Sequence, residues 1–484
     1  MEILGTACGR KTLIRHGRGN ITIAVLIFSS LGVFVMSSLV NWALLNSRLN
    51  NQRQAKELAF QIAEAGIEYY RWHLAHAPGD FQDGTGLAGP YYHNFENKAG
   101  AVVGQFRLEI TPPPSGSTKV IITSTATTTS YANVKRVIRA QYAIPSLAKY
   151  AVVANDVMRF GSGTETFGPI HSNNGIRFDG LAHNLITSGV ANYNDPDHSG
   201  NNEFGVHTHV NPVDPLPPAA VPVRTDVFIA GRQFPVPAVD FPGLTSDLSS
   251  LKSQAQSGGI YLSGSGYLGY RMVLKTNDTF DLYRVTSLSS APSRCTNSQS
   301  QTGWGTWSVN AQTLLGNYNF PGNGIIFVED HLWVEGIIQT ARLTIAAGRF
   351  PETPSTNASI TVNANLKYTT YDAQDALALI AQNNFNVGLN SADTLQIDAA
   401  IIAKNGRAGR YYYSSFCGGN YVRTKITLNG MIATNQRYGF AYTDGTGYVL
   451  RSINYDTNLL YAPPPSFPLA SSEYQIISWE DISN

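Results

Sequence analysis

Apolar side chains fill one uninterrupted stretch near the start of the chain. Residues 21–45 read ITIAVLIFSSLGVFVMSSLVNWALL and hold no charged side chain. An α-helix rises about 1.5 Å per residue, so this stretch is long enough to cross a hydrocarbon layer of about 30 Å. Trp42 lies near its far end, where an amphipathic ring suits a membrane interface. The pattern predicts a membrane-spanning helix. A cleaved signal peptide fits poorly, because the apolar region is long and no cleavage motif of small residues precedes Asn46.

A second, amphipathic pattern follows, and no proline or turn cluster separates it from the first. Apolar residues recur at spacings of four, three, four and three in the series Leu58, Ile62, Ala65, Tyr69 and Trp72. This spacing places them on one face of a helix. The first proline of the chain lies beyond them, at position 78. We therefore predict one helix over residues 21–76. Its first half is apolar all round, and its second half docks onto a folded domain through Leu58, Ile62, Ala65 and Tyr69.

Alternating apolar and polar positions come next along the chain. Residues 103–110, 119–128 and 134–144 each show the period of two, or the β-branched composition, that is typical of strands. The turn segment PPPSGS separates the first two. These patterns predict an antiparallel β domain over residues 78–148 that covers the apolar stripe of the helix.

Beyond residue 149 helical patterns nearly vanish, and short β-rich pieces recur, each ended by Gly or Asn. Strands with turn signals every 8–12 residues are typical of a sandwich, a barrel or a β-solenoid. A repeated Gly-x-Ile motif at 168–170, 336–338 and 430–432 favours the solenoid. We predict a parallel β-helix in two blocks of rungs, residues 149–210 and 321–484, with its open end capped by a last strand near the C-terminus.

The segment between the two blocks has a different pattern. Residues 211–223 are proline-rich, which predicts an extended linker. A short helix is predicted over 244–255, with Thr245 or Ser246 capping it, and strands at 260–262, 270–275 and 279–286. We therefore predict that residues 211–320 form a linker and an inserted α+β domain.

The N-terminal motifs, taken together, resemble type IV pilins. A basic leader ends RHGRG before Asn20, a membrane-length helix follows, and residues 55–66 read AKELAFQIAEAG. The last segment resembles minor pilins of the PilX-type N-terminal family, where A-F-Q-x-A-E-A recurs. The resemblance implies a leader over residues 1–19, a membrane-to-stalk helix over 20–77, and cleavage by a prepilin peptidase between Gly19 and Asn20.

Two positions depart from the pilin pattern. Ala24 stands where major pilins carry a glutamate that offsets the N-terminal ammonium group of a neighbouring subunit inside an apolar filament. Asn20 stands where Phe or Met is usual. The resemblance implies other pilin subunits as partners of the N-terminal helix, and it places the helix in the cytoplasmic membrane and the head outside the cell or in a surface pilus.

Composition and charge agree with an exported, β-rich protein. Charged residues make up 14% of the chain, below the share of about 25% that is usual for soluble domains, and the formal net charge is +1. Nothing in this balance draws the protein to nucleic acid, so no nucleic-acid partner is expected. Cys295 and Cys417 lie beyond the apolar run, whereas Cys8 precedes it. A Cys295–Cys417 disulfide and two buried free thiols are both open interpretations.

Candidate chemistry is sparse. His207 and His209 place two imidazoles on one side of a strand and could bind a metal with His198, His183 or His171, although exposed loop histidines are the favoured interpretation. Asp195 and Asp197 lack the full calcium-loop pattern. A carboxylate pair for sugar cleavage could come from four aspartates, Asp372, Asp375, Asp393 and Asp398. Their spacing singles out no pair, so we predict no catalytic residue, no metal and no cofactor.

The preferred hypothesis is a non-enzymatic minor pilin or pilus-associated surface protein. Its helix would anchor it in a membrane or filament core, and its β-rich head would be displayed for adhesion or assembly, with a surface glycan or protein as ligand. One alternative is a membrane-tethered β-helical protein that binds or cleaves polysaccharide. Another is a signal-anchored surface protein that never enters a pilus.

Overall fold

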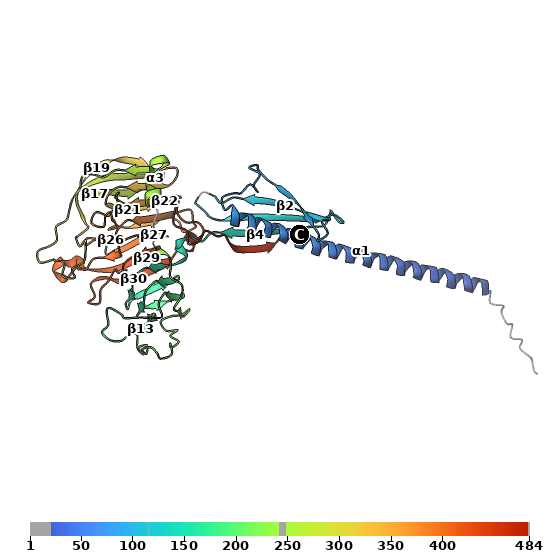
Figure 1. Cartoon of the computed structure of the whole chain (residues 1–484), viewed down its shortest axis with the longest axis horizontal. Helices are drawn as coiled ribbons and strands as arrows, with labels where there is room; N and C mark the ends of the chain where they lie inside the picture. The colour runs from blue at the N-terminus through green and yellow to red at the C-terminus, as the bar shows by residue number, and fades with distance from the viewer. Residues whose placement is uncertain (1–20, 115, 242–247, 483–484) are drawn as a thin grey trace, which may run out of the picture.

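A long helix, an antiparallel sheet and a large β-rich head follow one another along the molecule (Figure 1). The computed structural model describes residues 21–114, 116–241 and 248–482. Helix α1 (Ile21–His76) runs unbroken over 56 residues, a length of about 84 Å at 1.5 Å per residue. The predicted single helix is confirmed, as is the arrangement of helix, antiparallel sheet and a region rich in parallel strands.

The second half of α1 packs on a five-stranded sheet with the order β1-β2-β3-β4-β31, in which every neighbouring pair is antiparallel. The strands are β1 (Tyr91–Glu96), β2 (Val102–Thr111), β3 (Val120–Thr128), β4 (Lys135–Ala143) and β31 (Gln475–Asp481). Three of them match the predicted strands. The last strand was expected to cap the head, and that prediction is wrong. β31 returns to the five-stranded sheet, which forms the stalk together with the second half of α1, and pairs with β4.

The helix face against the sheet is offset from the predicted stripe. Ile62 is fully buried, whereas Leu58, Ala65 and Tyr69 are half-buried and Trp72 is 60% exposed. The buried face is made by Ala55, Ala59, Ile62, Ala63, Gly66, Ile67, Tyr70 and Leu74. A Cβ atom at Gly66 would lie 2.4 Å from the Ser124 hydroxyl oxygen of β3, so the missing side chain lets the helix backbone approach the sheet. Because small residues contact the sheet, the buried face of the helix lies about one position away from the predicted stripe.

The head is a solenoid of parallel strands with three faces. The first face stacks β16 (Ile260–Leu262), β20 (Ile325–Val328), β22 (Arg342–Ala347), β25 (Ala376–Ala381), β27 (Thr394–Ala403), β29 (Val422–Thr434), β5 (Val152–Ala154), β8 (Ile170–Ser172), β11 (Ile186–Ser188) and β15 (Arg232–Gln233). Inside this face, register partners form a buried aliphatic column of Ile326, Ile345, Leu379, Ile401, Ile432, Val152, Ile170 and Ile186.

The other two faces complete each coil. The second stacks β17 (Gly269–Leu274), β21 (Leu332–Ile338), β24 (Leu366–Tyr368), the first parts of β27 and β29, β30 (Gly447–Tyr455), β7 (Thr164–Phe167) and β10 (Leu181–Ala182). The third holds β23 (Ile360–Thr361), β26 (Phe385–Val387), β28 (Ala408–Arg410), β6 (Met158–Phe160), β9 (Ile176–Phe178) and β14 (Val206–His207).

The order of coils in space differs from the order in sequence. β5, the first strand after the stalk, lies in the middle of the stack, beside β29. The chain coils outward from β5 to β15, crosses to the far end, and coils back from β16 to β29 and β30. Coils of the two predicted blocks therefore meet in the middle.

The segment predicted as an inserted domain is instead part of the solenoid and its cover. β16 and β17 are coil strands, and β18 (Thr279–Leu288) and β19 (Val309–Asn319) extend the second face as an antiparallel hairpin at one end. α3 (Leu248–Gly258) buries Leu248, Leu251 and Ala255 against the outer side of the first face. α3 overlaps the helix predicted over 244–255. The predicted caps Thr245 and Ser246 lie outside the described residues.

The Gly-x-Ile motif marks corners between faces. Gly336 and Gly430 have φ angles of 119° and 142°, a region that favours glycine. A Cβ atom at either position would come within 2.2 Å of a backbone oxygen of the neighbouring coil. The motif therefore appears where the chain must bend while the coils stay in close contact.

The offset contact face of α1 leads to a test on two substitutions. We expect Ile62→Ala to lower the local stability of the helix–sheet unit by about 2–5 kcal/mol, because it opens a cavity under the sheet beside Gly104 of β2. The matched variant Trp72→Ala, on the exposed face, should change it by no more than about 0.5 kcal/mol. Hydrogen exchange of the β3 and β4 amides in the full chain measures both. Equal losses for the two variants would contradict the assignment of the buried face.

Candidate functional site

The first half of α1 is an apolar rod that the rest of the described chain leaves uncovered. Phe28, Phe34 and Met36 are each more than 70% exposed. An 18-residue window of this helix has a mean hydropathy of 2.4, and none of it is buried. By length and composition the helix is able to cross a membrane. Gly19 and Asn20, the predicted cleavage residues, lie outside the described residues.

Two antiparallel connections join the sheet to the head at one place. The Ser146 N–H donates to the Leu460 carbonyl at 2.8 Å, and the Leu147 N–H donates to the Pro468 carbonyl at 2.9 Å. The Ser146 hydroxyl, which is buried, donates to the Leu459 carbonyl at 2.7 Å. The chain therefore enters and leaves the solenoid side by side, through hydrogen-bonded segments.

Arg342 ties three parts of the chain together at this junction. Its Nη2 donates to the carbonyls of Gly116 in the stalk at 3.0 Å, and of Ala462 and Pro463 in the returning segment at 2.6 and 2.7 Å. Its Nη1 donates to the Ala373 carbonyl in the head. Burial lowers the pKa of Arg342 from its ordinary value. Sequence reasoning missed this residue because its partners come from segments hundreds of residues apart.

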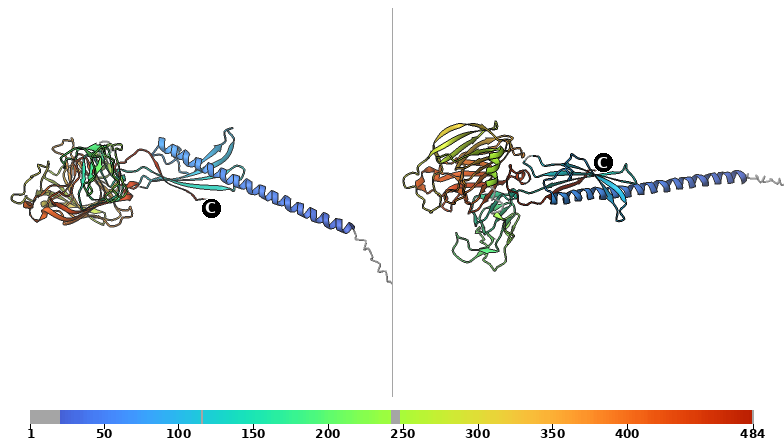
Figure 2. Two further views of the ribbon diagram at one scale, coloured as in Figure 1. Left: turned by 90° about the horizontal axis from the view of Figure 1, so that it is seen from below. Right: turned by 45° about the horizontal axis from the view of Figure 1, so that its top comes forward.

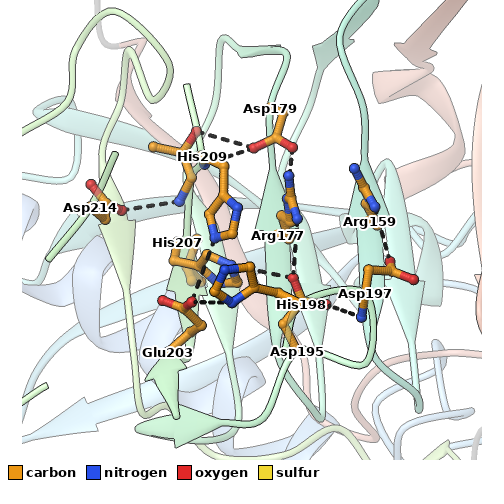
Figure 3. A network of polar contacts seen from close by, with 12 residues as sticks. Arg159, Arg177, Asp179, Asp195, Asp197, His198, Glu203, His207, His209 and Asp214 are labelled. Atoms are coloured by element: carbon orange, nitrogen blue, oxygen red, sulfur yellow. Dashed lines mark hydrogen bonds and ion pairs between the residues drawn. The ribbon is translucent and has the colours of Figure 1, made fainter. Parts of the chain in front are cut away.

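A cluster of histidines and carboxylates lies at the end of the solenoid near β13 (Glu203–Phe204), which pairs with β12 (Asn192–Tyr193) (Figures 1 and 3). Three of the histidines considered from the sequence, His198, His207 and His209, come together there with Asp195 and Glu203. The donor atoms form two triads that share His209, and within each triad they lie within 4.8 Å of one another.

The distances inside the cluster fall just beyond ordinary hydrogen bonds. His207 Nε2 lies 3.6 Å from an Asp195 carboxylate oxygen. A Glu203 carboxylate oxygen lies 3.3 Å from His198 Nδ1 and 3.5 Å from His209 Nε2. His207 is fully buried, and neither of its ring nitrogens has a hydrogen-bond partner.

Two carboxylates outside the strands hold the segment that carries His207 and His209. The Asp179 carboxylate accepts the His209 N–H at 2.8 Å and the Nε–H of Arg177 at 2.7 Å. The buried Asp214 carboxylate accepts the Thr208 N–H at 3.0 Å. The β14–β9 pairing at His207 and these two carboxylates therefore hold the backbone from which both rings project.

The electrostatic environment favours the charged form of Asp195 and the neutral form of His209. Burial raises the pKa of Asp195, but contacts with His207, the Asp197 N–H and Arg177 outweigh it, so the net pKa is below its ordinary value. Burial lowers the pKa of His209, and the positive charge of Arg177 lowers it further.

Other candidates from the sequence lie elsewhere. His171 contacts Thr187 and Asn173, and His183 pairs with Glu165 at 2.9 Å. Neither joins the cluster. Asp197 pairs with Arg437 and Arg159. Glu203 was missed, and its one signal in the sequence is its place four residues before His207 in the same β-rich segment.

The four aspartates considered for sugar cleavage are held by different partners. Asp398 is fully buried and accepts from the Tyr368 N–H, the Tyr371 hydroxyl and the Asn429 amide. Asp375 is buried and accepts backbone N–H groups of a turn. Asp372 and Asp393 likewise accept hydrogen bonds within their own turns or from the next coil.

Cys295 and Cys417 form a disulfide across 122 residues. It ties the loop before β19 to the loop before β29, in a small buried cluster with Leu389, Tyr411 and Tyr413. Both tyrosine side chains are buried and donate to backbone carbonyls of the 302–305 segment. Packing therefore explains these two aromatic residues.

The described residues define a class of protein with a long helix whose second half packs on an antiparallel sheet and whose first half is uncovered. A parallel solenoid is inserted before the last strand of that sheet (Figure 2). No protein-family model and no curated protein matches the chain. Among solved structures the chain is similar to the competence-associated pilin ComZ from Thermus thermophilus. The identity is 14% over 88% of this chain and 97% of that chain, with a TM-score of 0.28. A likeness at this level assigns no function.

The disulfide leads to a prediction on stability. We expect the double variant Cys295→Ser, Cys417→Ser to unfold with a free energy lower by about 2–5 kcal/mol, because a long loop is no longer closed in the unfolded chain. Denaturant unfolding in micelles measures this. Cys8→Ser is the matched control and should leave stability unchanged, and wild type in reductant should match the double variant. An unaltered midpoint in reductant would contradict the prediction.

Arg342 leads to a prediction on the junction. Arg342→Met keeps the apolar stem but removes the donors, so the returning segment should lose about 1–3 kcal/mol of local stability where carbonyls are left unpaired. Hydrogen exchange over residues 457–470 measures the loss. Arg271→Met, which breaks a half-buried pair with Glu335 on the second face, should leave these amides unchanged. The same amide protection in both variants would contradict a stabilising role of the Arg342 hydrogen bonds at the junction.

Proposed function

We propose that this protein is a pilus-type minor pilin or pilus-associated surface protein. Its helix inserts in a membrane and then in the apolar core of a filament, and its solenoid head is displayed for adhesion or assembly. The head acts by binding and carries out no catalysis. Its partners are other pilin subunits along the helix and a glycan or protein at the head.

The division of α1 into two halves is the observation that supports this proposal most. The first half presents apolar side chains on all sides, and the second half packs one face against the sheet. A membrane anchor alone needs only the first half. A rigid helix that continues into the folded domain fixes the direction in which the head points, as a filament subunit requires.

The placement of the head favours the end of a filament. The coils stack across the direction of α1, so the head extends to both sides of the stalk (Figures 1 and 2). Copies packed side by side along a shaft would meet at the heads before their helices came into contact. Ala24, which carries no charge to offset a neighbouring N-terminal ammonium, fits a subunit that has no other subunit above it.

The mature N-terminus and its location test the proposal. We expect N-terminal sequencing of the cellular protein to begin at Asn20, and sheared surface filaments to contain it. Gly19→Leu should block processing and remove the protein from filaments, because the peptidase needs a small residue before the cleaved bond. Gly17→Leu, two residues earlier in the leader, is the matched control and should be processed normally.

Two results would contradict it. A chain that begins at Met1 and stays in the membrane fraction would favour the signal-anchored alternative. Release of sugar fragments from a polysaccharide by the purified full chain would contradict a head that only binds and would favour the enzyme alternative.

A further inference from the structure

The histidine cluster near β13 differs from the other histidine–carboxylate pairs of the described chain. His73–Asp80, His93–Asp83 and His183–Glu165 close to 3.0, 2.7 and 2.9 Å, the distances of ordinary hydrogen bonds. The three contacts in the cluster stay open at 3.3, 3.5 and 3.6 Å. The side chains are therefore close but do not satisfy one another.

The open spacing has a simple geometric explanation. Two donors that each lie about 2.0–2.1 Å from one tetrahedral ion are about 3.3–3.4 Å apart. In one triad Glu203 lies 3.3 and 3.5 Å from His198 and His209, and in the other Asp195 lies 3.6 Å from His207, all near this value. Figure 3 shows these side chains converging on one another.

The buried polar atoms of the cluster lack partners. Both ring nitrogens of His207, Nε2 of His209 and one Asp195 carboxylate oxygen are buried without a hydrogen bond. Asp195 and Glu203 are 3% and 2% exposed. A buried carboxylate needs a compensating charge, and Arg177 is shared: it lies 3.5 Å from an Asp195 oxygen and pairs more closely with Asp179, at 2.7 Å. A divalent cation would balance the two remaining negative charges.

We infer that this cluster is a binding site for one divalent transition-metal ion of the zinc type. The triad of Asp195, His207 and His209 supplies the inner donors, and His198 and Glu203 form the second triad with His209 beside it. Mixed imidazole and carboxylate donors suit Zn²⁺, whereas Ca²⁺ and Mg²⁺ prefer oxygen donors throughout. The inference is independent of the proposed pilus function.

The surroundings of the cluster fit this assignment. The backbone that carries the two rings is held by the β14–β9 pairing at His207, by the His209 N–H bond to Asp179 and by the Thr208 N–H bond to Asp214. His198 is the most exposed of the donors, with 44% of its side chain open to solvent, and lies on the 194–202 loop. An ion can therefore reach the site from this side.

Metal titration of the full chain in micelles tests the inference. After treatment with EDTA, we expect Zn²⁺ to bind with a stoichiometry of one ion per chain and to raise the thermal unfolding midpoint, with Ca²⁺ showing neither effect. Elemental analysis of protein purified without chelator should find the ion. Co²⁺ in place of Zn²⁺ should give visible absorption bands typical of a nitrogen- and oxygen-ligated tetrahedral site.

Three variants separate ligation from structure. His209→Gln, at the residue shared by both triads, should abolish binding. His198→Ala removes a partly exposed side chain, so it should fold normally yet weaken Zn²⁺ binding about 10–100-fold. His183→Ala is the matched control, since it removes a histidine paired with a glutamate elsewhere on the solenoid, and should bind like wild type.

Clear results would overturn the inference. Folded wild type that fails to bind Zn²⁺ with an affinity on the order of micromolar or tighter would exclude a built site. Tighter binding of Ca²⁺ than of Zn²⁺ would exclude imidazole ligation. An equal loss of affinity in His183→Ala and His198→Ala would show that the ion binds at scattered surface histidines.

Discussion

The return of the chain from the head to the stalk is the constraint on which the rest of the structure depends. β31 completes the antiparallel sheet only after the entire solenoid has been built, and it pairs with β4, the strand from which the head began. The outgoing and returning segments must therefore lie side by side, which the backbone hydrogen bonds of Ser146 and Leu147 achieve. Since β4 and β31 are more than 300 residues apart, this closure couples the stalk to the whole head.

That constraint also explains the unusual order of the coils. A solenoid whose chain starts at one end and finishes at the other would place its two termini far apart. Here the coils begin at β5 and finish at β30, and β30 lies beside β7, one face away from β5. The cost of this arrangement is one long crossing from β15 to β16. α3 lies on that crossing, and the first face accommodates it through small outward residues such as Ala346, Ala378 and Ala400.

The local elements were predictable from the sequence, because their signals are local. The 56 residues of α1, three strands of the sheet, β16 and the corner glycines all follow from periodicity or from a backbone requirement within a few residues. The rest depends on partners far along the chain. Nothing near the last strand announces that it pairs with β4, and the offset of the helix stripe depends on how closely Gly66 approaches β3. The histidine cluster was visible only in part, because Glu203 and Asp195 meet the histidines through the fold of the 194–202 loop.

The two ends of the solenoid are closed by different physical means. At one end the antiparallel hairpin of β18 and β19 continues the second face, so backbone hydrogen bonds extend the sheet and apolar residues of β18 continue the core. At the other end the strands shrink to two residues in β10, β12, β13, β14 and β15, too short to bury much apolar area. Polar contacts take over there: Asp214 pairs with Arg232, Asp179 pairs with Arg177, and the carboxylate–imidazole cluster fills the space between the loops. Small folds with little core usually need a covalent or metal cross-link, and an ion at this cluster would supply one where the rungs are shortest.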